Sequence, residues 1–273
     1  GGGMRGLYTA GILEYFLEED IHFPYIIGVS AGACMAASYL SEQPGRNKTV
    51  NIDFVNDKRY LSLSNLIKNG ELFGMDFIFD KIPNELVPLD VKKILSGKEE
   101  FVIVTTNCST GEPMYFYKKD YEEKTLGKLL RASSSIPFIA DTVEYNGVQM
   151  LDGGIVDPLP IVKAESDGHE KNVVILTKPR GYYKKPGRMS NIINYNKHPK
   201  VDERMKIRYK HYNERLEYIF EQEKKGNVIV LAPSVDLGVG RTTRKPAKLE
   251  ALYELGFNDA KEKAAEIKKF LKD

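Results

Sequence analysis

A serine between glycines, placed where an apolar run gives way to a helical one, constrains this chain most. Residues 28–32 read Gly-Val-Ser-Ala-Gly, after the apolar residues 25–27 and before the small residues 33–37. Glycines allow a strand to turn sharply into a helix, and such a turn exposes the hydroxyl of Ser30 as a nucleophile. The start of that helix directs N–H groups at any oxyanion formed there. The motif predicts acyl transfer, and the alternative is a tight turn in which Ser30 only caps the helix.

Apolar runs that alternate with helical patterns predict an α/β fold. Residues 101–106, 173–176 and 228–231 are apolar or β-branched throughout, as in strands that helices cover on both faces. We therefore expect a three-layer α/β/α sandwich with a mainly parallel central sheet. Asn146-Gly147, inside an alternating segment, indicates a hairpin.

The expected elements follow from the hydrophobic periodicity and from helix and strand end signals. The helices are expected at Leu7 to Glu19, Ala31 to Tyr39, Tyr121 to Ala132, Asp202 to Glu223 and Pro246 to Leu271. The strands are expected at Tyr25 to Gly28, Phe101 to Thr106, Pro113 to Tyr117, Val143 to Leu151, Val173 to Thr177 and Val228 to Leu231.

Composition and length fit one globular domain of 273 residues with a sizeable core. We expect a single domain over 1–273, with a catalytic core at about 1–180 and a helical C-terminal part at about 200–273. The net charge of +2 argues against a nucleic-acid partner. No apolar run approaches the roughly 18 residues of a membrane span. Cys34 and Cys108 are too few for a disulfide framework, so we expect reduced thiols and a cytoplasmic protein.

A second glycine cluster, Gly-Gly-Gly-Met-Arg-Gly at residues 1–6, precedes the first helical pattern. Its free N–H groups suit a bound phosphate or the oxyanion of a tetrahedral intermediate. The acidic residue of a dinucleotide site and the Gly-Lys-Ser/Thr ending of a P-loop are both absent. The oxyanion hole is therefore favoured, and Arg5 is either a group that steers a phosphate or carboxylate headgroup or a surface charge. The expected oxyanion donors are Gly1, Gly2, Gly3, Met4 and Ala31.

The serine needs a base. His22 and His211 fit surface positions, while His169 or His198 would complete a triad in the order serine, acid, histidine, with nothing nearby to mark either. Asp152 is the stronger candidate, because it ends an apolar strand and precedes two glycines. A carboxylate is a weak base in water, so partial desolvation by the apolar flank has to strengthen it. The alternative is an Asx turn in which the carboxylate caps its own loop.

Residues 1–6, 28–32 and 152–154, in this order and at these separations, resemble the patatin-like phospholipase family. Residues 131–138 and, for the bacterial branch, residues 72–76 are similar to it as well, and the resemblance covers about 1–160. It implies a dyad of Ser30 and Asp152 without a catalytic histidine, and the first glycine loop as oxyanion hole. It also implies a short strand before Gly1, which this sequence lacks. No metal or organic cofactor is implied.

The expected activity is hydrolysis of lipid carboxylic esters through an acyl-enzyme. The aromatic residues 72–79, with Ile82 and Pro83, are expected to line an acyl channel or form a lid, or else to pack as core. The basic segment 178–188 with its two tyrosines either touches an anionic membrane transiently or is only solvated. The alternatives are a non-catalytic lipid-binding or interaction module and a histidine-dependent esterase. The lipid, the ester position cut and the oligomeric state do not follow from the sequence.

Overall fold

A computed structural model describes residues 1–187 and 194–272. In chain order, the helical elements are η1 Gly3–Arg5, α1 Gly6–Glu18, α2 Ala31–Leu40, α3 Arg46–Lys48, η2 Thr49–Asp53, α4 Leu63–Asn69, η3 Phe77–Leu86, α5 Val91–Ser96, η4 Lys118–Asp120, α6 Glu123–Ser134, η5 Gly153–Ile155, α7 Ile161–Ser166, α8 Pro199–Lys224 and α9 Pro246–Phe270. The strands are β1 Tyr25–Val29, β2 Glu100–Asn107, β3 Pro113–Phe116, β4 Val143–Tyr145, β5 Val148–Asp152, β6 Asn172–Ile175 and β7 Val228–Leu231.

The expectation of a mainly parallel central sheet is wrong, because the larger sheet is mixed. Its strands follow the order β1-β2-β5-β4, with β3 also paired to β2. Only β1 runs parallel to β2; β3 and β5 are antiparallel to β2, and β4 is antiparallel to β5. The parallel strands β6 and β7 form a separate two-stranded sheet.

Short connections explain two of the three antiparallel pairs in this sheet, β2 with β3 and β4 with β5. Residues 108–112 join β2 to β3, and Asn146-Gly147 joins β4 to β5 with positive φ angles of 50° and 78°. Connections this short return the chain beside the strand it has just left, whereas parallel neighbours need a long crossover. The apolar runs correctly predicted the strands β2, β6 and β7, of which β2 and β7 are buried and β6 is half-buried. Burial, however, does not fix strand direction. The predicted hairpin is confirmed.

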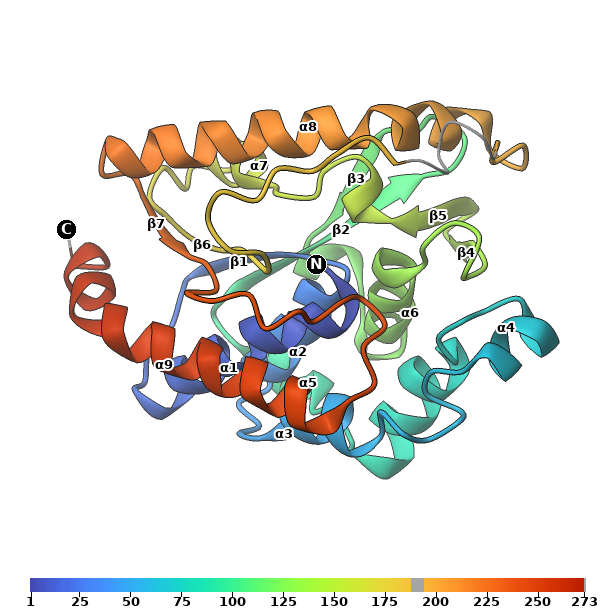
Figure 1. The fold of residues 1–273 in the computed structure, drawn as a ribbon, viewed down its shortest axis with the longest axis horizontal. Helices are drawn as coiled ribbons and strands as arrows, with labels where there is room; N and C mark the ends of the chain where they lie inside the picture. The colour runs from blue at the N-terminus through green and yellow to red at the C-terminus, as the bar shows by residue number, and fades with distance from the viewer. Residues whose placement is uncertain (188–193, 273) are drawn as a thin grey trace.

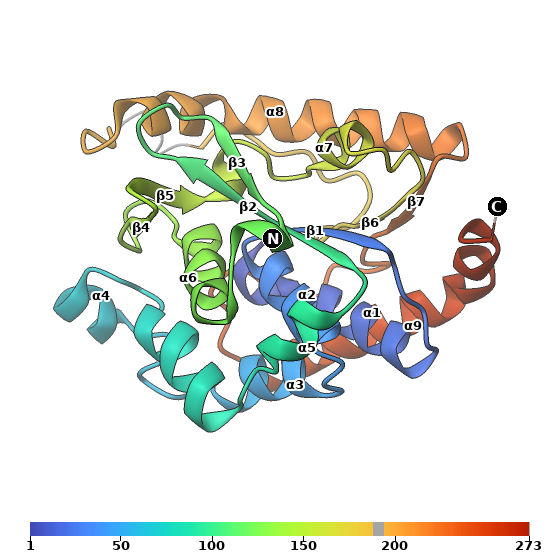
Figure 2. The same cartoon turned by 180° about the vertical axis from the view of Figure 1, so that it is seen from behind.

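Helices lie on both sides of the strands, which gives an α/β fold (Figure 1). Seen from either direction, α8 and α7 cover one side, and α1, α2, α5, α6 and α9 cover the other (Figure 2). None of the helices in the described ranges is long and apolar enough to span a membrane.

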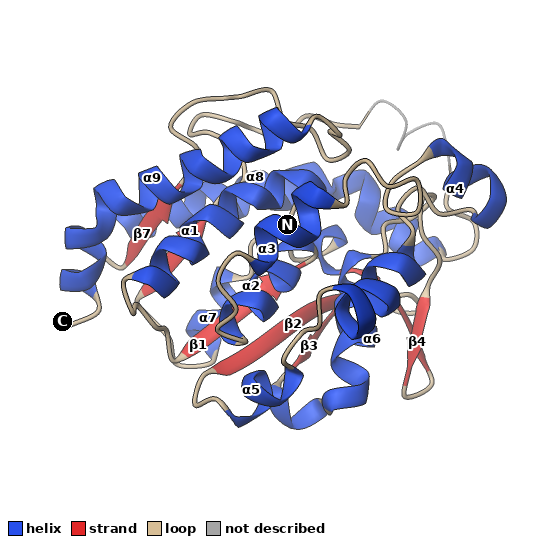
Figure 3. Cartoon of the chain, turned by 90° about the horizontal axis from the view of Figure 1, so that it is seen from below, coloured by secondary structure: helices blue, strands red, loops and turns tan. Residues whose placement is uncertain are grey.

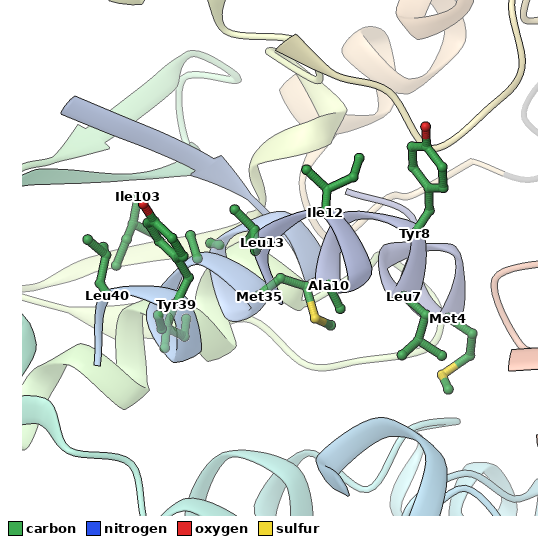
Figure 4. Packing of buried hydrophobic residues seen from close by; sticks show 14 of the residues in the cluster. Met4, Leu7, Tyr8, Ala10, Ile12, Leu13, Met35, Tyr39, Leu40 and Ile103 are labelled. Carbon is green, nitrogen blue, oxygen red and sulfur yellow. The ribbon is translucent and has the colours of Figure 1, made fainter. Parts of the chain in front are cut away.

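The main core is built around α1, whose side chains are buried almost all the way round. Its apolar residues point into the core together with those of α2 and β2 (Figure 4). The C-terminal helix α9 lies along α1 (Figure 3). Two glycines permit this close contact, because a Cβ at Gly11 would lie 1.9 Å from the Tyr253 carbonyl oxygen and one at Gly256 would lie 2.1 Å from that of Tyr8. Helices from the two ends of the chain therefore share one core.

The predicted long helices and strands all occur, with ends that shift by at most three residues. The prediction missed the short helical pieces between residues 46 and 96, which are α3, η2, α4, η3 and α5. Helices α3, η2, α4 and α5 are too short to show a clear helical period, and η3 contains Pro83. Of these pieces, α3, η2 and η3 contribute to one wall of the site described next.

Candidate active site

Ser30 occupies a sharp turn between β1 and α2. Its φ of 56° lies in the left-handed region that few residues other than glycine adopt. The strand and helix approach so closely that a Cβ at Gly28 would lie 2.6 Å from the Cα of Ala33. The side chain of Ser30 makes no capping hydrogen bond to the helix. The hydroxyl is therefore held out of the turn, as in the strained strand-to-helix turns that carry nucleophiles.

A buried serine holds this turn in place. Ser133, at the end of α6, accepts the backbone N–H of Ser30 at 2.8 Å and donates its own hydroxyl to the Val104 carbonyl at 2.6 Å. The turn is thereby tied both to α6 and to the central strand β2. Ser133 lies within residues 131–138, which resemble the patatin-like family. The sequence gave no sign that Ser133 holds the turn at Ser30.

Asp152 lies at the end of β5 and is 4% exposed. Its N–H donates to the Ser135 carbonyl at 2.7 Å, and its carbonyl accepts the Thr106 hydroxyl at 2.8 Å, so the backbone is fixed on both sides. The Gly154 N–H donates to carboxylate oxygen Oδ1 at 2.7 Å. Asp152 thus forms the Asx turn that the sequence analysis gave as the alternative role of this carboxylate. Within the described residues, its second oxygen Oδ2 accepts no hydrogen bond.

Ser30 and Asp152 line the same cavity, of about 240 Å³, which we call the basic cavity. Gly1, Gly2 and Gly3 line it too, and a Cβ at Gly1 would lie 2.8 Å from the Cβ of Ser30. The first glycine loop is therefore packed directly against the serine. The fold brings together three segments that lie far apart in the sequence.

The N–H groups of the glycine loop differ in their availability. In the described part of the chain, those of Gly2, Gly3 and Ala31 have no hydrogen-bond partner. The Met4 N–H, one of the expected oxyanion donors, instead donates to the Arg241 carbonyl at 3.0 Å. Met4 is therefore not free to serve as a donor, and its side chain is buried in the core. This hydrogen bond could not be predicted, because Arg241 lies far from Met4 in the sequence.

Ser30 also lines a second cavity, of about 140 Å³, which we call the apolar cavity. Gly3, Ser30 and Ile136 line both cavities. Most of its lining comes from α2, from the short helices of residues 46–96 and from α6. The apolar part of that lining includes Met4, Cys34, Met35, Val50, Phe73, Met75, Ile78, Phe79, Ile82, Pro83, Leu89, Leu130 and Ile139. The aromatic stretch singled out in the sequence thus reaches a cavity that contains the candidate nucleophile.

Positive charge gathers in the basic cavity. Arg5 lines it as expected, and the structure adds Lys184, Arg208 and Arg241. Burial lowers the pKa of Arg208 to about 10, and burial together with the nearby arginines lowers the pKa of Lys184 to about 6. Sequence reasoning missed Arg208 and Arg241, and it placed Lys184 in a segment expected to touch a membrane or to be solvated. Arg208 and Arg241 lie in a part of the chain where no catalytic or binding motif marks them.

The basic segment 178–188 turns partly inward. Lys178, Tyr182 and Lys184 line the basic cavity, while Tyr183 is 47% exposed. Asn213 on α8 holds the segment by accepting the Lys184 N–H at 2.8 Å and donating to its carbonyl at 3.0 Å. Arg188, the last residue of that predicted surface, lies outside the described residues.

The four histidines all fall within the described residues, and none lines either cavity. His22 lies 2.9 Å from Asp20 at the surface, and His169 stacks on Tyr25. His198 and His211 lie at the beginning and in the middle of α8. No histidine is therefore positioned beside Ser30.

Groups that bind metals are dispersed in the part of the chain that the structure describes, where no three His, Cys, Asp or Glu side chains gather. Cys34 and Cys108 are both free thiols. Burial raises the pKa of each to about 11, so both are protonated at neutral pH.

A family model described as patatin-like phospholipase matches residues 1–164, and a domain of unknown function (DUF6363) matches residues 198–272. The chain is 28% identical over 193 residues to the uncharacterized protein YjjU of Escherichia coli, a match that covers 68% of this chain and 52% of that protein. It is 25% identical over 289 residues to the lysophospholipase NTE1 of Scheffersomyces stipitis, covering 95% of this chain and 17% of that protein.

The chain thus spans about half of the length of YjjU and a smaller share of NTE1. Its fold is similar to that of VipD from Legionella pneumophila, with a TM-score of 0.57 and 11% identity over 96% of this chain and 65% of that one. Since the family model matches well over half of its residues, the chain belongs to the patatin-like phospholipase family.

Proposed function

We propose that this protein is a serine acyl hydrolase that cleaves carboxylic ester bonds of lipids through a dyad of Ser30 and Asp152. The observation that carries the proposal is the position of Ser30 where two unlike cavities meet. One cavity is apolar and suits an acyl chain, and the other is polar and charged and suits the alcohol part of an ester. An ester that occupies both would place its carbonyl carbon at the serine hydroxyl.

In the first half-reaction, Asp152 accepts the hydroxyl proton of Ser30 while Oγ attacks the ester carbonyl carbon. The carbonyl oxygen becomes an oxyanion, for which the N–H groups of Gly2, Gly3 and Ala31 are available. One well-placed donor of this kind is worth about 3–4 kcal/mol of barrier. As the carbon–oxygen bond to the alcohol breaks, Asp152 returns the proton to the departing oxygen, and an acyl-Ser30 ester remains.

In the second half-reaction, water attacks the acyl carbon and gives a proton to Asp152. The same N–H groups hold the second oxyanion. Its collapse releases the fatty acid, and the proton returns to the Oγ of Ser30. Asp152 acts as base and then as acid in both halves, so no further titrating residue is needed.

Two observations favour the dyad over a histidine-dependent esterase. Asp152 shares the basic cavity with Ser30, and no histidine of the described residues lines either cavity. The match to a lysophospholipase favours an enzyme over a non-catalytic lipid-binding module.

The test compares native protein with Ser30→Ala and Asp152→Asn, using a long-chain lipid ester and a serine-directed fluorophosphonate probe. We expect Ser30→Ala to lose both hydrolysis and labelling, and Asp152→Asn to lose about a thousandfold or more in rate. The matched control is the double variant His169→Ala/His198→Ala, which should keep native activity.

Each contrary result points to a particular alternative. Activity that survives in Asp152→Asn but disappears in the double histidine variant would indicate a histidine-dependent esterase. Lipid binding without hydrolysis or probe labelling in the native protein would indicate the non-catalytic module.

Three further expectations stay part of the proposal. The first is one domain over 1–273, which the shared core of α1 and α9 favours. The second is transient membrane contact, for which the exposed Tyr183 and Lys185 are available. The third is the absence of a nucleic-acid partner, in keeping with the net charge of +2.

A further inference from the structure

Five basic side chains from separate parts of the chain line the basic cavity beside Ser30. Arg5 follows the glycine loop, and Lys178 and Lys184 come from the segment after β6. Arg208 comes from α8, and Arg241 from the connection between β7 and α9. In Figure 1 this connection passes across the start of α1, which brings Arg241 to the glycine loop. The C-terminal part of the chain therefore completes a wall of the site.

These charges lack partners. Among residues 1–187 and 194–272, the side chains of Arg5, Arg208 and Arg241 form no ion pair and no hydrogen bond. The Nε atoms of Arg5 and Arg208 are buried. A buried guanidinium without an acceptor is costly, and it is retained where a ligand supplies the acceptor.

Asp152 does not balance this charge. It is the only carboxylate among the described residues that line the cavity. A Cβ at Gly154 would lie 2.9 Å from its Oδ1 and 3.0 Å from the Nη2 of Arg208, so the two groups flank the same glycine. This one carboxylate faces three guanidinium groups, those of Arg5, Arg208 and Arg241. Burial, Arg208 and Arg241, in that order, lower the pKa of Lys184 to about 6, which reflects the positive potential of the cavity.

The cavity also disfavours a headgroup that carries its own positive charge. Tyr182 and Tyr212, which line it, offer the aromatic faces that a quaternary ammonium group would need. The Nζ atom of Lys178 already lies 5.3 Å from the Tyr182 ring centre, and that of Lys184 lies 5.4 Å from the Tyr212 ring centre. The cavity therefore favours a net negative group.

We propose, building on the lipid ester hydrolase function above, that the basic cavity binds an anionic phosphate on the alcohol part of the substrate. Arg208 and Arg241 act with Arg5 as specificity-determining residues. Guanidinium groups suit this role because they bind phosphate oxygens through paired N–H donors. The preferred substrate is thus an acyl ester of a glycerophosphate, with its acyl chain in the apolar cavity and its phosphate in the basic one.

The kinetic test uses three substrates with the same acyl chain: oleoyl glycerophosphate, mono-oleoylglycerol and oleoyl glycerophosphocholine. We expect kcat/KM of the native enzyme to be at least about tenfold higher for the first than for the other two. In Arg208→Gln and in Arg241→Gln, this preference should fall by about tenfold or more. Arg208→Lys should recover part of it, because a lysine keeps the charge but not the paired donors.

The matched control is Lys210→Gln, which removes one charge from an exposed position on the same helix, α8, outside the cavity. It should keep the native preference. Since Arg208 is buried and its replacement can affect folding, thermal unfolding of each variant is measured alongside, and Arg241→Gln provides an independent readout.

A binding arm separates this proposal from the hydrolase function. Calorimetry with glycerol phosphate on Ser30→Ala protein should show binding, and the double variant Ser30→Ala/Arg208→Gln should show its loss. If the native protein hydrolyses no ester but this binding difference is found, the anion site stands and the proposed activity fails.

Three outcomes would overturn the anion site. The first is hydrolysis of all three substrates with equal kcat/KM. The second is an equal loss on all three in Arg208→Gln and Arg241→Gln. The third is competitive inhibition by inorganic phosphate without any preference for oleoyl glycerophosphate, since the cavity would then take free phosphate and not a headgroup.

Discussion

The hydroxyl of Ser133 links Ser30 to the centre of the sheet. It accepts the Ser30 N–H at 2.8 Å and donates to the Val104 carbonyl at 2.6 Å, and Ser133 itself is fully buried. A turn with a φ of 56° is unfavourable by itself, so it persists only where the surroundings fix it. This bridge supplies part of that constraint.

Replacing Ser133 with alanine should destabilise the protein and lower its activity. The change leaves the buried N–H of Ser30 without its hydrogen-bond partner, which costs about 1–3 kcal/mol. We expect a matching loss in the free energy of unfolding, measured by urea titration, and slower labelling of Ser30 by a fluorophosphonate probe. The conservative variant Ser133→Thr should restore part of the labelling rate, because it keeps the hydroxyl.

The control for this prediction is Ser96→Ala. Its hydroxyl donates to the Lys93 carbonyl at an exposed position, so its loss should change stability by less than about 0.5 kcal/mol. Equal effects of the two replacements would contradict the role assigned to Ser133.

The close packing of α1 against α9 should make Gly256 intolerant of a side chain. A Cβ there would lie 2.1 Å from the Tyr8 carbonyl, so Gly256→Ala has to push the helices apart, at a cost of about 1–3 kcal/mol. Thermal or urea unfolding measures this loss. Gly127→Ala in α6 is the matched control, since its Cβ would meet only an ordinary contact at 3.6 Å. In a helix, that control should be neutral or stabilise by up to about 1 kcal/mol.

Filling the apolar cavity should shorten the acyl chains that the enzyme accepts. Val50 on η2 lines this cavity, and Val50→Trp would occupy space that a long chain needs. We expect kcat/KM for an oleoyl ester to fall about tenfold more than for an acetyl ester. Ile67→Trp, at a position on α4 that is 84% exposed, should leave the ratio of the two rates unchanged. A uniform loss on both esters would place the acyl chain elsewhere.

Lys184 should make stability depend on pH. Its pKa is lowered from 10.5 to about 6 by burial and the nearby arginines, so between these values it is neutral in the folded protein and charged in the unfolded one. Unfolding then takes up a proton, and stability rises with pH across this window by about 1.4 kcal/mol per pH unit from this group.

In Lys184→Met, the slope of unfolding free energy against pH, measured by urea titration from about pH 7 to 9, should therefore fall by that amount. The exposed neighbour Lys185 provides the control, and Lys185→Met should keep the native slope. An unchanged slope in Lys184→Met would show that this lysine stays charged in the folded protein.

The local sequence determined the elements and the chemistry around Ser30 and Asp152. Glycines around Ser30 dictated the turn, apolar runs dictated buried strands, and Asn146-Gly147 dictated a hairpin, because each depends on backbone preferences of adjacent residues. Such preferences are short in range. They could not reveal that β5 pairs with β2 and runs antiparallel to it, because β3, α6 and β4 separate these two strands in the chain.

Only the tertiary structure decided what surrounds the serine. The bridge through Ser133 and the Arg241 carbonyl on Met4 join segments separated by about a hundred residues or more. No local catalytic or binding motif marks Arg208 and Arg241, because what a guanidinium group binds depends on the cavity that surrounds it. The sequence by itself therefore determined the nucleophile turn and the strands that carry it. Long-range packing decided which amides stay free and which charges meet in the cavity.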